Sequence, residues 1–433
     1  MEEKFLYHIW DEGHLNPDLK TASGKALRII YPGQYNTNRG PDFCNAIISI
    51  DGEAIGGDVE IHLGTYDWIA HCHHEDHFYN NTILHVVLEH KQSTHLTIKE
   101  NGDTIEILEL KDQLSEDIGK LLARQIPGEK PRSVSYCDLL SAVDAHRLSS
   151  ILSYYGMKRF RGKIKRFNAA LILSDFDQVF YEGMMEALGY DKNKLNLLKI
   201  AQLVPYRRIR EWQAEGMDAL DLISIISVGS GLLERSKKLV DESFAALLNI
   251  RFEAQNFSAQ RMEIDWQLFR IRPTNHPIYR IIAICGLLLK TTDSGLINYF
   301  LNHVQGFSPQ EGHWYRGFSA IFAKNALPGA EKFPQPGKSV ISNIYLNIFL
   351  PVMHLYHEKV ADSKTLSRVV EEYQSFAALQ DNHITRFMAN HANPRLVPLA
   401  SSKSIYQQGL IEIYYRWCRH RLCDECVRTS RDT

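Results

Sequence analysis

Residues 40–62 read GPDFCNAIISIDGEAIGGDVEIH, and this stretch decides the fold of the N-terminal part of the chain. Residues 43–50 form an apolar run that predicts a strand, and Asp51-Gly52 is a dipeptide that favours a two-residue hairpin turn. Residues 58–63 alternate apolar and polar side chains, which predicts a second strand with one apolar face. The other face of that strand carries Glu60 and His62, so one side of the hairpin is expected to carry the polar side chains of a functional site.

The same patterns extend outward from the hairpin. They predict a helix within residues 1–14, a strand at 26–31, a helix at 65–79, a buried strand at 83–88 and a hairpin that turns at 101–102. From about residue 139 long helical patterns follow, and Pro127-Gly128 with Pro131 indicates a linker before them. We therefore predict an α+β protein with a mixed-sheet domain over residues 1–130 and a larger all-α domain over residues 131–433.

Composition limits the function classes. The chain has 433 residues, 44% hydrophobic and 23% charged, which excludes disordered and fibrous proteins. Its 49 basic and 51 acidic residues nearly balance, but residues 1–130 hold only 11 of the basic and 22 of the acidic residues. That part also contains ten of the nineteen histidines. An acidic, histidine-rich stretch suits a divalent metal better than a phosphate group.

Targeting and redox signals are also limited. The N-terminus starts with acidic residues and no apolar segment, and the runs at 281–289 and 344–350 are shorter than the about 20 residues that cross a bilayer. We expect a cytoplasmic protein without membrane segments, and the oligomeric state stays open. Seven cysteines in such a chain favour reduced thiols or metal ligands over disulfides.

The first candidate site consists of Asp42, Glu60 and His62. Two carboxylates on neighbouring strands can share Mg²⁺ or Mn²⁺, which activates water and polarises a phosphoryl oxygen. Regular pairing around the turn would point Asp42 away from Glu60. A one-residue bulge at Gly56-Gly57 would instead place Asp42 opposite His62 and on the same side as Glu60, and we favour this second register.

A second candidate site is a cluster of histidines on the predicted helix at 65–79. Residues three or four apart share a helix face, so pairs of these histidines can chelate zinc or a similar ion. The alternative is a solvated polar face. The candidate ligands are His71, His73, His74, Asp76 and His77, with His85 on the following strand.

A third candidate site lies near the C-terminus, where Cys418, Cys423 and Cys426 have the spacing Cys-x4-Cys-x2-Cys. Such thiolates suit an iron–sulfur cluster or structural zinc, with His420, Cys137 or Cys285 as the fourth ligand. A C-terminal helix that carries unliganded thiols is the alternative.

A basic stretch lies in the helical part. Six cations within nine residues predict either contacts with the phosphates of a nucleic acid or a solvated or internally docked helix face. They are Lys158, Arg159, Arg161, Lys163, Lys165 and Arg166.

Taken together, the N-terminal motifs resemble an uncharacterised bacterial family, a full-length domain of unknown function. The motifs are Gly33-Gln34-Tyr35-Asn36, Gly40-Pro41-Asp42-Phe43, GDVEIH at 57–62, Asp67-Trp68, His71, His73-His74, Asp76 and LHVV at 84–87. The N-terminal domain also distantly resembles the PD-(D/E)XK nuclease superfamily, with its restriction-endonuclease-like order of helix, three strands, helix and strand. That resemblance implies metal-binding roles for Asp42 and Glu60, but His62 stands where the superfamily has a lysine.

The leading functional hypothesis is a metal-dependent phosphodiesterase or nuclease-like protein, with His62 as third ligand or base. One alternative is a non-catalytic nucleic-acid-binding or scaffold protein. Another is a zinc-dependent hydrolase built on the histidine cluster. The chain has no Walker A loop, dinucleotide glycine motif, G-x-S-x-G elbow or H-E-x-x-H pair, which disfavours NTPases, dehydrogenases and serine hydrolases.

Overall fold

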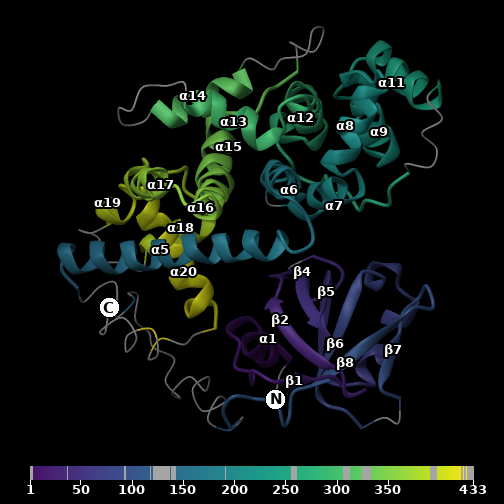
Figure 1. Ribbon diagram of the computed structural model, residues 1–433, viewed down its shortest axis with the longest axis vertical. Helices are drawn as coiled ribbons and strands as arrows, with labels where there is room; N and C mark the ends of the chain where they lie inside the picture. The colour runs from purple at the N-terminus through teal and green to yellow at the C-terminus, as the bar shows by residue number, and fades with distance from the viewer. Residues whose placement is uncertain are drawn as a thin grey trace. The chain divides into compact units, whose positions relative to one another are not determined.

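A computed structural model confirms the α+β class, with a mixed sheet followed by a larger helical region (Figure 1). It describes residues 3–36, 38–91, 94–117, 119, 137, 143–190, 192–254, 261–305, 313–323, 333–390, 397–420, 423 and 426. The chain forms two compact units. The sheet unit comprises Met1–Leu139, Asn168–Leu173 and Ile413–Thr433, and the helical unit comprises Leu140–Phe167 and Ser174–Glu412. The linker expected at residues 127–131 lies outside the described residues.

The sheet unit begins with helix α1, and eight strands follow in one sheet. Their order across the sheet is β1-β2-β4-β5-β6-β8-β7, and β3 pairs with β4. Among the described strands, the β5–β6 and β6–β8 pairs are parallel and the other pairs are antiparallel. The elements are α1 (Glu3–Glu12), β1 (Leu19–Lys20), β2 (Ala26–Tyr31), β3 (Gln34–Tyr35), β4 (Phe43–Ile50), β5 (Glu53–Gly64), β6 (Thr82–Glu89), β7 (Leu96–Ile98) and β8 (Thr104–Glu109).

The β4–β5 hairpin turns at Asp51-Gly52 as expected. Both residues have positive φ, 50° and 90°, which is the conformation that a type I′ turn requires. From the turn the strands pair regularly as far as Ala46 opposite Gly57. This hairpin carries both carboxylates of the predicted site, so its register decides whether they meet.

The predicted bulge at Gly56-Gly57 is wrong; the register changes on the other strand, between Phe43 and Ala46. The extra residue is Asn45, whose φ of 57° is left-handed and whose backbone N–H donates to Asp58 Oδ1 at 2.9 Å. Beyond the bulge Phe43 pairs with Val59, and one further step places Asp42 opposite Glu60 rather than His62. The bulge therefore brings the two carboxylates together by a different register.

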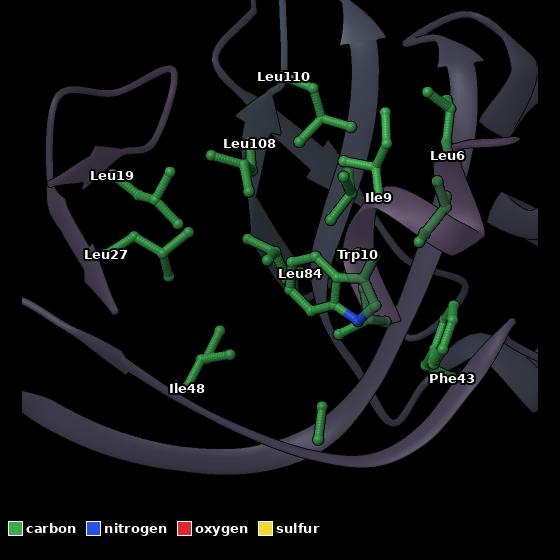
Figure 2. Close-up of a cluster of buried hydrophobic side chains, with 14 of the residues drawn as sticks. Leu6, Ile9, Trp10, Leu19, Leu27, Phe43, Ile48, Leu84, Leu108 and Leu110 are labelled. Carbon is green, nitrogen blue, oxygen red and sulfur yellow. The ribbon is translucent and has the colours of Figure 1, made fainter. Parts of the chain in front are cut away.

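One face of the sheet is apolar and is covered by α1. Figure 2 shows Leu6, Ile9 and Trp10 of this helix among the strand side chains. Phe43, Val59 and Ile61 belong to the same buried cluster, as predicted for the face opposite the carboxylates. Because side chains alternate along a strand, burial of Val59 and Ile61 sends Glu60 and His62 to the other face.

The connection from β5 to β6 crosses that second face. The single helix expected at 65–79 is wrong: the segment forms α2 (Asp67–Ala70) and two 3₁₀ turns, η1 (His73–Glu75) and η2 (His77–Tyr79). Cys72 breaks the helix because its φ is 61°, a left-handed conformation that a right-handed helix excludes. His73 and His77 are therefore not neighbours on one helix face.

The helical unit forms the larger part of the chain (Figure 1). Its elements are α5 (Ala145–Ala170), α6 (Phe176–Leu188), α7 (Lys194–Leu203), α8 (Tyr206–Ala214), α9 (Ala219–Gly229), α10 (Leu232–Arg235), α11 (Glu242–Ala254), η4 (Pro273–Asn275), α12 (Pro277–Thr291), α13 (Leu296–Gln305), α14 (His313–Ala323), α15 (Lys338–Ile344), the π-helix η5 (Tyr345–Phe349), α16 (Leu350–Lys359), α17 (Ser363–Ser375), α18 (His383–Asn390), α19 (Val397–Ala400) and α20 (Ser404–Arg416). Both α5 and α20 extend into the sheet unit, and η7 (Cys418–His420) follows α20.

One continuous helical run, Lys338–Lys359, is long and apolar enough to cross a membrane by length and composition, and 72% of its apolar window is buried inside the protein. Pro351 in this run has no N–H to donate to the preceding turn, which fits the local π-helical hydrogen bonding at η5. Burial among the other helices accounts for the apolar character of this run.

Candidate metal centre

The Asp42 and Glu60 carboxylates each accept a backbone N–H from the chain segment that carries the other residue. The Asp42 backbone N–H donates to Glu60 Oε2 at 2.9 Å, and the Ile61 N–H donates to Asp42 Oδ2 at 3.0 Å. The Tyr7 hydroxyl of α1 donates a further hydrogen bond to the Asp42 carboxylate. These bonds fix both carboxyl groups at the point where β4 begins beside β5.

The two carboxyl groups are costly to ionise together. Burial raises the pKa of Asp42 to about 8, and the nearby Glu60 carboxylate adds to this effect. Burial likewise raises the pKa of Glu60 to about 8. Without a cation in the pocket, both groups therefore retain protons near neutral pH, whereas a bound divalent ion would favour their ionised forms.

Imidazole groups surround the second oxygen of Glu60. Its Oε1 atom lies 3.4 Å from His62 Nε2 and 3.2 Å from His73 Nε2. His71 Nδ1 lies 3.2 Å from the same His62 Nε2 atom. Among the described residues, His62, His71 and His73 form the one group of three whose donor atoms all lie within 4.8 Å of one another.

A second layer of polar groups supports His62. His62 Nδ1 lies 2.9 Å from His85 Nε2, and His85 Nδ1 lies 2.8 Å from Thr97 Oγ1 on β7. Burial lowers the pKa of His62 to about 2 and that of His85 to about 3, and neighbouring histidines add to both shifts. Both rings are therefore neutral, which is the form that binds metals.

Aromatic side chains form the wall of the pocket. The Tyr79 ring stacks on His73 with centroids 3.8 Å apart, and Trp68 packs edge-on against His73 at 5.5 Å. Trp68 is itself anchored by a hydrogen bond from Nε1 to the Ile98 carbonyl. His73 is buried whereas His71 is exposed, so solvent can reach the histidine cluster at His71.

The fold thus merges two sites that the sequence suggested separately. Glu60 and His62 of β5, His85 of β6, and His71 and His73 of the crossover segment meet in one pocket. Strand pairing explains part of this, because β5 and β6 are parallel neighbours with Glu60 in register with His85. His62 therefore contacts both His85 and the histidine segment.

The other predicted ligands of this segment have different partners. Asp76 accepts from Phe78 N as the cap of η2 and forms an ion pair with Arg39 at 2.9 Å. His74 lies 3.4 Å from Glu75, and the exposed His77 lies 3.7 Å from Asp76. None of these three residues belongs to the group of donor atoms at His62 among the described residues.

The structure does not gather the C-terminal cysteines into such a group within the part of the chain that it describes. Cys426 is buried, Cys418 is half-buried and Cys423 is exposed. Burial raises the pKa of Cys418 to about 12, and the Cys137 and Cys423 thiols add to the shift. Cys137, one of the three candidates for the fourth ligand, therefore lies near Cys418. A metal at this cluster stays a prediction.

The basic stretch on α5 is largely engaged inside the helical unit. Arg159 and Lys163 both donate to Gln408 Oε1, at 3.0 and 2.9 Å, and Arg166 pairs with Glu186. Among the six cations, Arg161 and Lys165 are exposed and Lys158 is half-buried. Nucleic-acid binding by this stretch stays a prediction that now depends mainly on Arg161 and Lys165.

Sequence reasoning missed several residues of the pocket. Neither Tyr7 nor Thr97 belongs to a motif, and their contacts with Asp42 and His85 depend on how the helix and strands are arranged in space. Glu3 at the start of α1 lies close enough to His71 and His73 for its charge to interact with them. The presence of Trp68 and Tyr79 among the histidines was the available signal for an enclosed pocket.

The fold and the pocket define the class: an α+β protein with a buried carboxylate–imidazole centre on one face of its sheet. The chain belongs to the family described as "Protein of unknown function (DUF2851)", whose profile matches residues 3–382. This finding confirms the resemblance to an uncharacterised domain family and covers most of both units. No curated protein and no solved structure matches the chain significantly.

Proposed function

We propose that this protein is a metal-dependent hydrolase that cleaves phosphodiester bonds. The observation that carries the proposal is the convergence of Asp42 and Glu60 with three imidazoles in a pocket that solvent can reach at His71. A divalent ion in such a pocket lowers the pKa of bound water and polarises a phosphoryl oxygen. The sequence prediction of Mg²⁺ or Mn²⁺ supplies the first ions to assay.

The protein groups would divide the remaining tasks. Glu60 offers Oε1 toward the imidazoles while its Oε2 accepts the Asp42 N–H, so its carboxylate is held in place. Asp42, the second carboxyl group, is positioned to accept a proton from water during attack on phosphorus. The neutral rings of His62 and His73 add donors without adding positive charge.

The proposed substrate is a nucleic acid. Exposed cations can bind its backbone phosphates, and such binding weakens steeply as salt concentration rises. Arg161 and Lys165 are exposed on α5, and Arg39 is exposed beside Phe78 and Asp76 in the sheet unit. A salt-dependent affinity that falls in the Arg161→Ala/Lys165→Ala variant would support this substrate class.

The direct test is hydrolysis of DNA, RNA and bis(p-nitrophenyl) phosphate with Mn²⁺. We expect activity in the wild type and a loss of roughly 100-fold or more in Asp42→Asn and Glu60→Gln, because each removes a carboxylate from the reacting centre. Glu106→Gln is the matched control, because Glu106 is a buried acid of the same sheet that pairs with Lys25. Equal activity in all three variants, or none in the wild type with any ion, contradicts the proposal.

One observation favours a second candidate, a non-catalytic binding or scaffold protein. Asp42 and Glu60 each accept a backbone N–H across the β4–β5 pair, so as neutral acids they can serve to hold the strands together. In that case the wild type shows salt-sensitive nucleic-acid binding without cleavage. The Glu60→Gln variant would then lose stability but no catalytic function.

A further inference from the structure

We infer that the pocket binds a nitrogen-preferring divalent ion of the zinc class, with His62 Nε2, His71 Nδ1, His73 Nε2 and Glu60 Oε1 as ligands and Asp42 outside the ligand set. The inference rests on the proposed function, which it deepens by naming the ion and its ligands. It departs from the sequence prediction, in which Asp42, Glu60 and His62 hold Mg²⁺ or Mn²⁺.

The first support is the spacing of the donor atoms. Two ligands of a tetrahedral zinc ion, each bound at about 2.0 Å, lie about 3.3 Å apart. Glu60 Oε1 lies 3.4 Å from His62 Nε2 and 3.2 Å from His73 Nε2. His71 Nδ1 lies 3.2 Å from His62 Nε2. Three of the six separations among the four donor atoms therefore match the distance that one shared ion requires, and the donor atoms of the three histidines all lie within 4.8 Å of one another.

The second support is a buried nitrogen without a hydrogen bond. His73 is 9% exposed, and its Nε2 atom has no hydrogen-bond partner although Glu60 Oε1 is only 3.2 Å away. The ring nitrogen and the carboxylate are thus close but are not aligned as donor and acceptor. A buried polar atom of this kind is costly, and a metal ion between the two atoms would satisfy both.

The third support is the layer behind His62. A metal-binding histidine commonly donates its other ring N–H to an acceptor, which fixes the ring and its tautomer. If His85 donates Nδ1–H to Thr97 Oγ1, its Nε2 accepts Nδ1–H from His62, and His62 Nε2 keeps its lone pair for the ion. The short contacts in this chain, 2.9 and 2.8 Å, permit this arrangement.

The donor types select the ion. Magnesium prefers oxygen ligands and retains several waters, whereas imidazole suits zinc and its neighbours in the first transition series. Asp42 is already held by hydrogen bonds from the Ile61 N–H and the Tyr7 hydroxyl, so its carboxyl group has partners without an ion. The exposed His71 places the ion within reach of solvent, and because zinc can expand to five ligands, a water could join the four protein groups.

The test is metal binding by the full chain after removal of metal with a chelator. Co²⁺, a spectroscopic substitute for Zn²⁺, should give the visible absorption of a tetrahedral site, and Zn²⁺ should displace it at one ion per chain. Mg²⁺ in large excess should not. The variants His71→Ala and His73→Ala should each weaken Zn²⁺ binding at least 100-fold, and Thr97→Val about 10-fold through the second layer.

His74→Ala is the matched control, because His74 neighbours His73 but pairs with Glu75; its Zn²⁺ affinity should equal that of the wild type. Asp42→Asn should change the affinity less than 10-fold. The inference is overturned if Mg²⁺ displaces Co²⁺, if no ion binds, or if Asp42→Asn weakens binding as much as His73→Ala. Zinc binding without hydrolysis would instead contradict only the proposed function, so the two failures are distinguishable.

Discussion

Glu60 is the residue on which the pocket is built. It is 5% exposed, and its two oxygens face different partners: Oε2 accepts from the Asp42 N–H, and Oε1 faces His62 and His73. A buried carboxylate without a cation is unstable, which explains the direction of its pKa shift. The residue therefore contributes little to stability until an ion enters the pocket.

The shifted carboxyl groups predict how the stability of the metal-free protein depends on pH. Asp42 and Glu60 have folded-state pKa values of about 8, above their ordinary values, so the folded state binds more protons between about pH 4 and 8. Their contribution to the free energy of unfolding is therefore lost as pH rises through this window. Thermal melting with a chelator present measures this effect. Raising the pH from 5 to 8 should lower the free energy of unfolding of Glu60→Gln less than that of the wild type, by on the order of 2 kcal/mol.

Glu106→Gln provides the comparison, because the pKa of Glu106 is lowered rather than raised. Its melting temperature should follow the pH dependence of the wild type or decline more steeply. If the melting temperature of Glu60→Gln falls with pH as steeply as that of the wild type, Glu60 is already ionised in the metal-free protein.

At the scale of the elements, the bulge in β4 decides whether Asp42 meets Glu60. Asn45 adopts a left-handed backbone conformation that asparagine tolerates and β-branched residues avoid. Its N–H bond to Asp58 Oδ1 holds the extra residue in place. Without the bulge, the regular strand register would place Asp42 opposite Ile61, on the apolar side of the sheet.

Substitutions at Asn45 test the role of the bulge. Asn45→Val should lower the free energy of unfolding by about 1–3 kcal/mol, because a β-branched residue is strained at positive φ. The same variant should weaken Zn²⁺ binding, because a displaced Asp42 N–H would no longer hold the Glu60 carboxylate through Oε2. Asn45→Gly is the control and should change both quantities little, since glycine accepts this conformation. Urea unfolding and zinc titration measure the two effects, and equal values for Val and Gly would refute the role of the bulge.

Gly57 serves close packing instead of the bulge that its sequence suggested. A Cβ atom here would lie 2.4 Å from Ile83 Cγ2 and 2.6 Å from the Asn81 carbonyl oxygen. We expect Gly57→Ala to destabilise the sheet unit by about 1–3 kcal/mol through overpacking. Gly52→Ala is a control without steric contact, although its positive φ adds strain of about 1 kcal/mol. Urea unfolding that shows Gly57→Ala no less stable than Gly52→Ala would contradict the packing argument.

At the scale of the whole molecule, the sheet unit is assembled from both ends of the chain. Arg416 at the end of α20 donates to Glu12 of α1 at 2.5 Å, and Arg419 lies 3.3 Å from Asp11. Arg419 also lies over the Tyr35 ring at 5.2 Å. The acidic end of α1 is thus neutralised by C-terminal arginines, so part of the charge imbalance along the sequence is compensated within this unit.

Because the candidate zinc site lies within the sheet unit, we expect zinc to slow hydrogen exchange in that unit and not in the helical unit. An ion that binds the folded state at 100 times its Kd adds about 2.7 kcal/mol to stability. Hydrogen exchange of the full chain should therefore slow by about 100-fold in β5, β6 and residues 71–79, where opening of the site limits exchange. Amides of α6 in the helical unit provide the internal control and should exchange as before. Uniform protection of both units, or of neither, would contradict a site confined to the sheet unit.

The sequence by itself determined the α+β class, the strands at 26–31 and 43–50, and most of the residues that meet in the pocket. Periodicity and turn dipeptides are local, so they predicted the Asp51-Gly52 hairpin and the apolar face that contains Val59 and Ile61. Composition also pointed to this region, because histidines and acids are concentrated there and lysines are few. These signals need only neighbouring residues to be read.

Only the tertiary structure decided which of these residues act together. The left-handed conformations of Asn45 and Cys72 set the strand register and broke the helix, and neither residue type demands that conformation. The Tyr7–Asp42 contact joins elements that are separated by three strands in sequence, and the Thr97–His85 contact joins β7 to β6 although β8 lies between them in the sheet. Such choices depend on which long-range packing is most stable, because a one-residue change of register reverses every side chain of a strand.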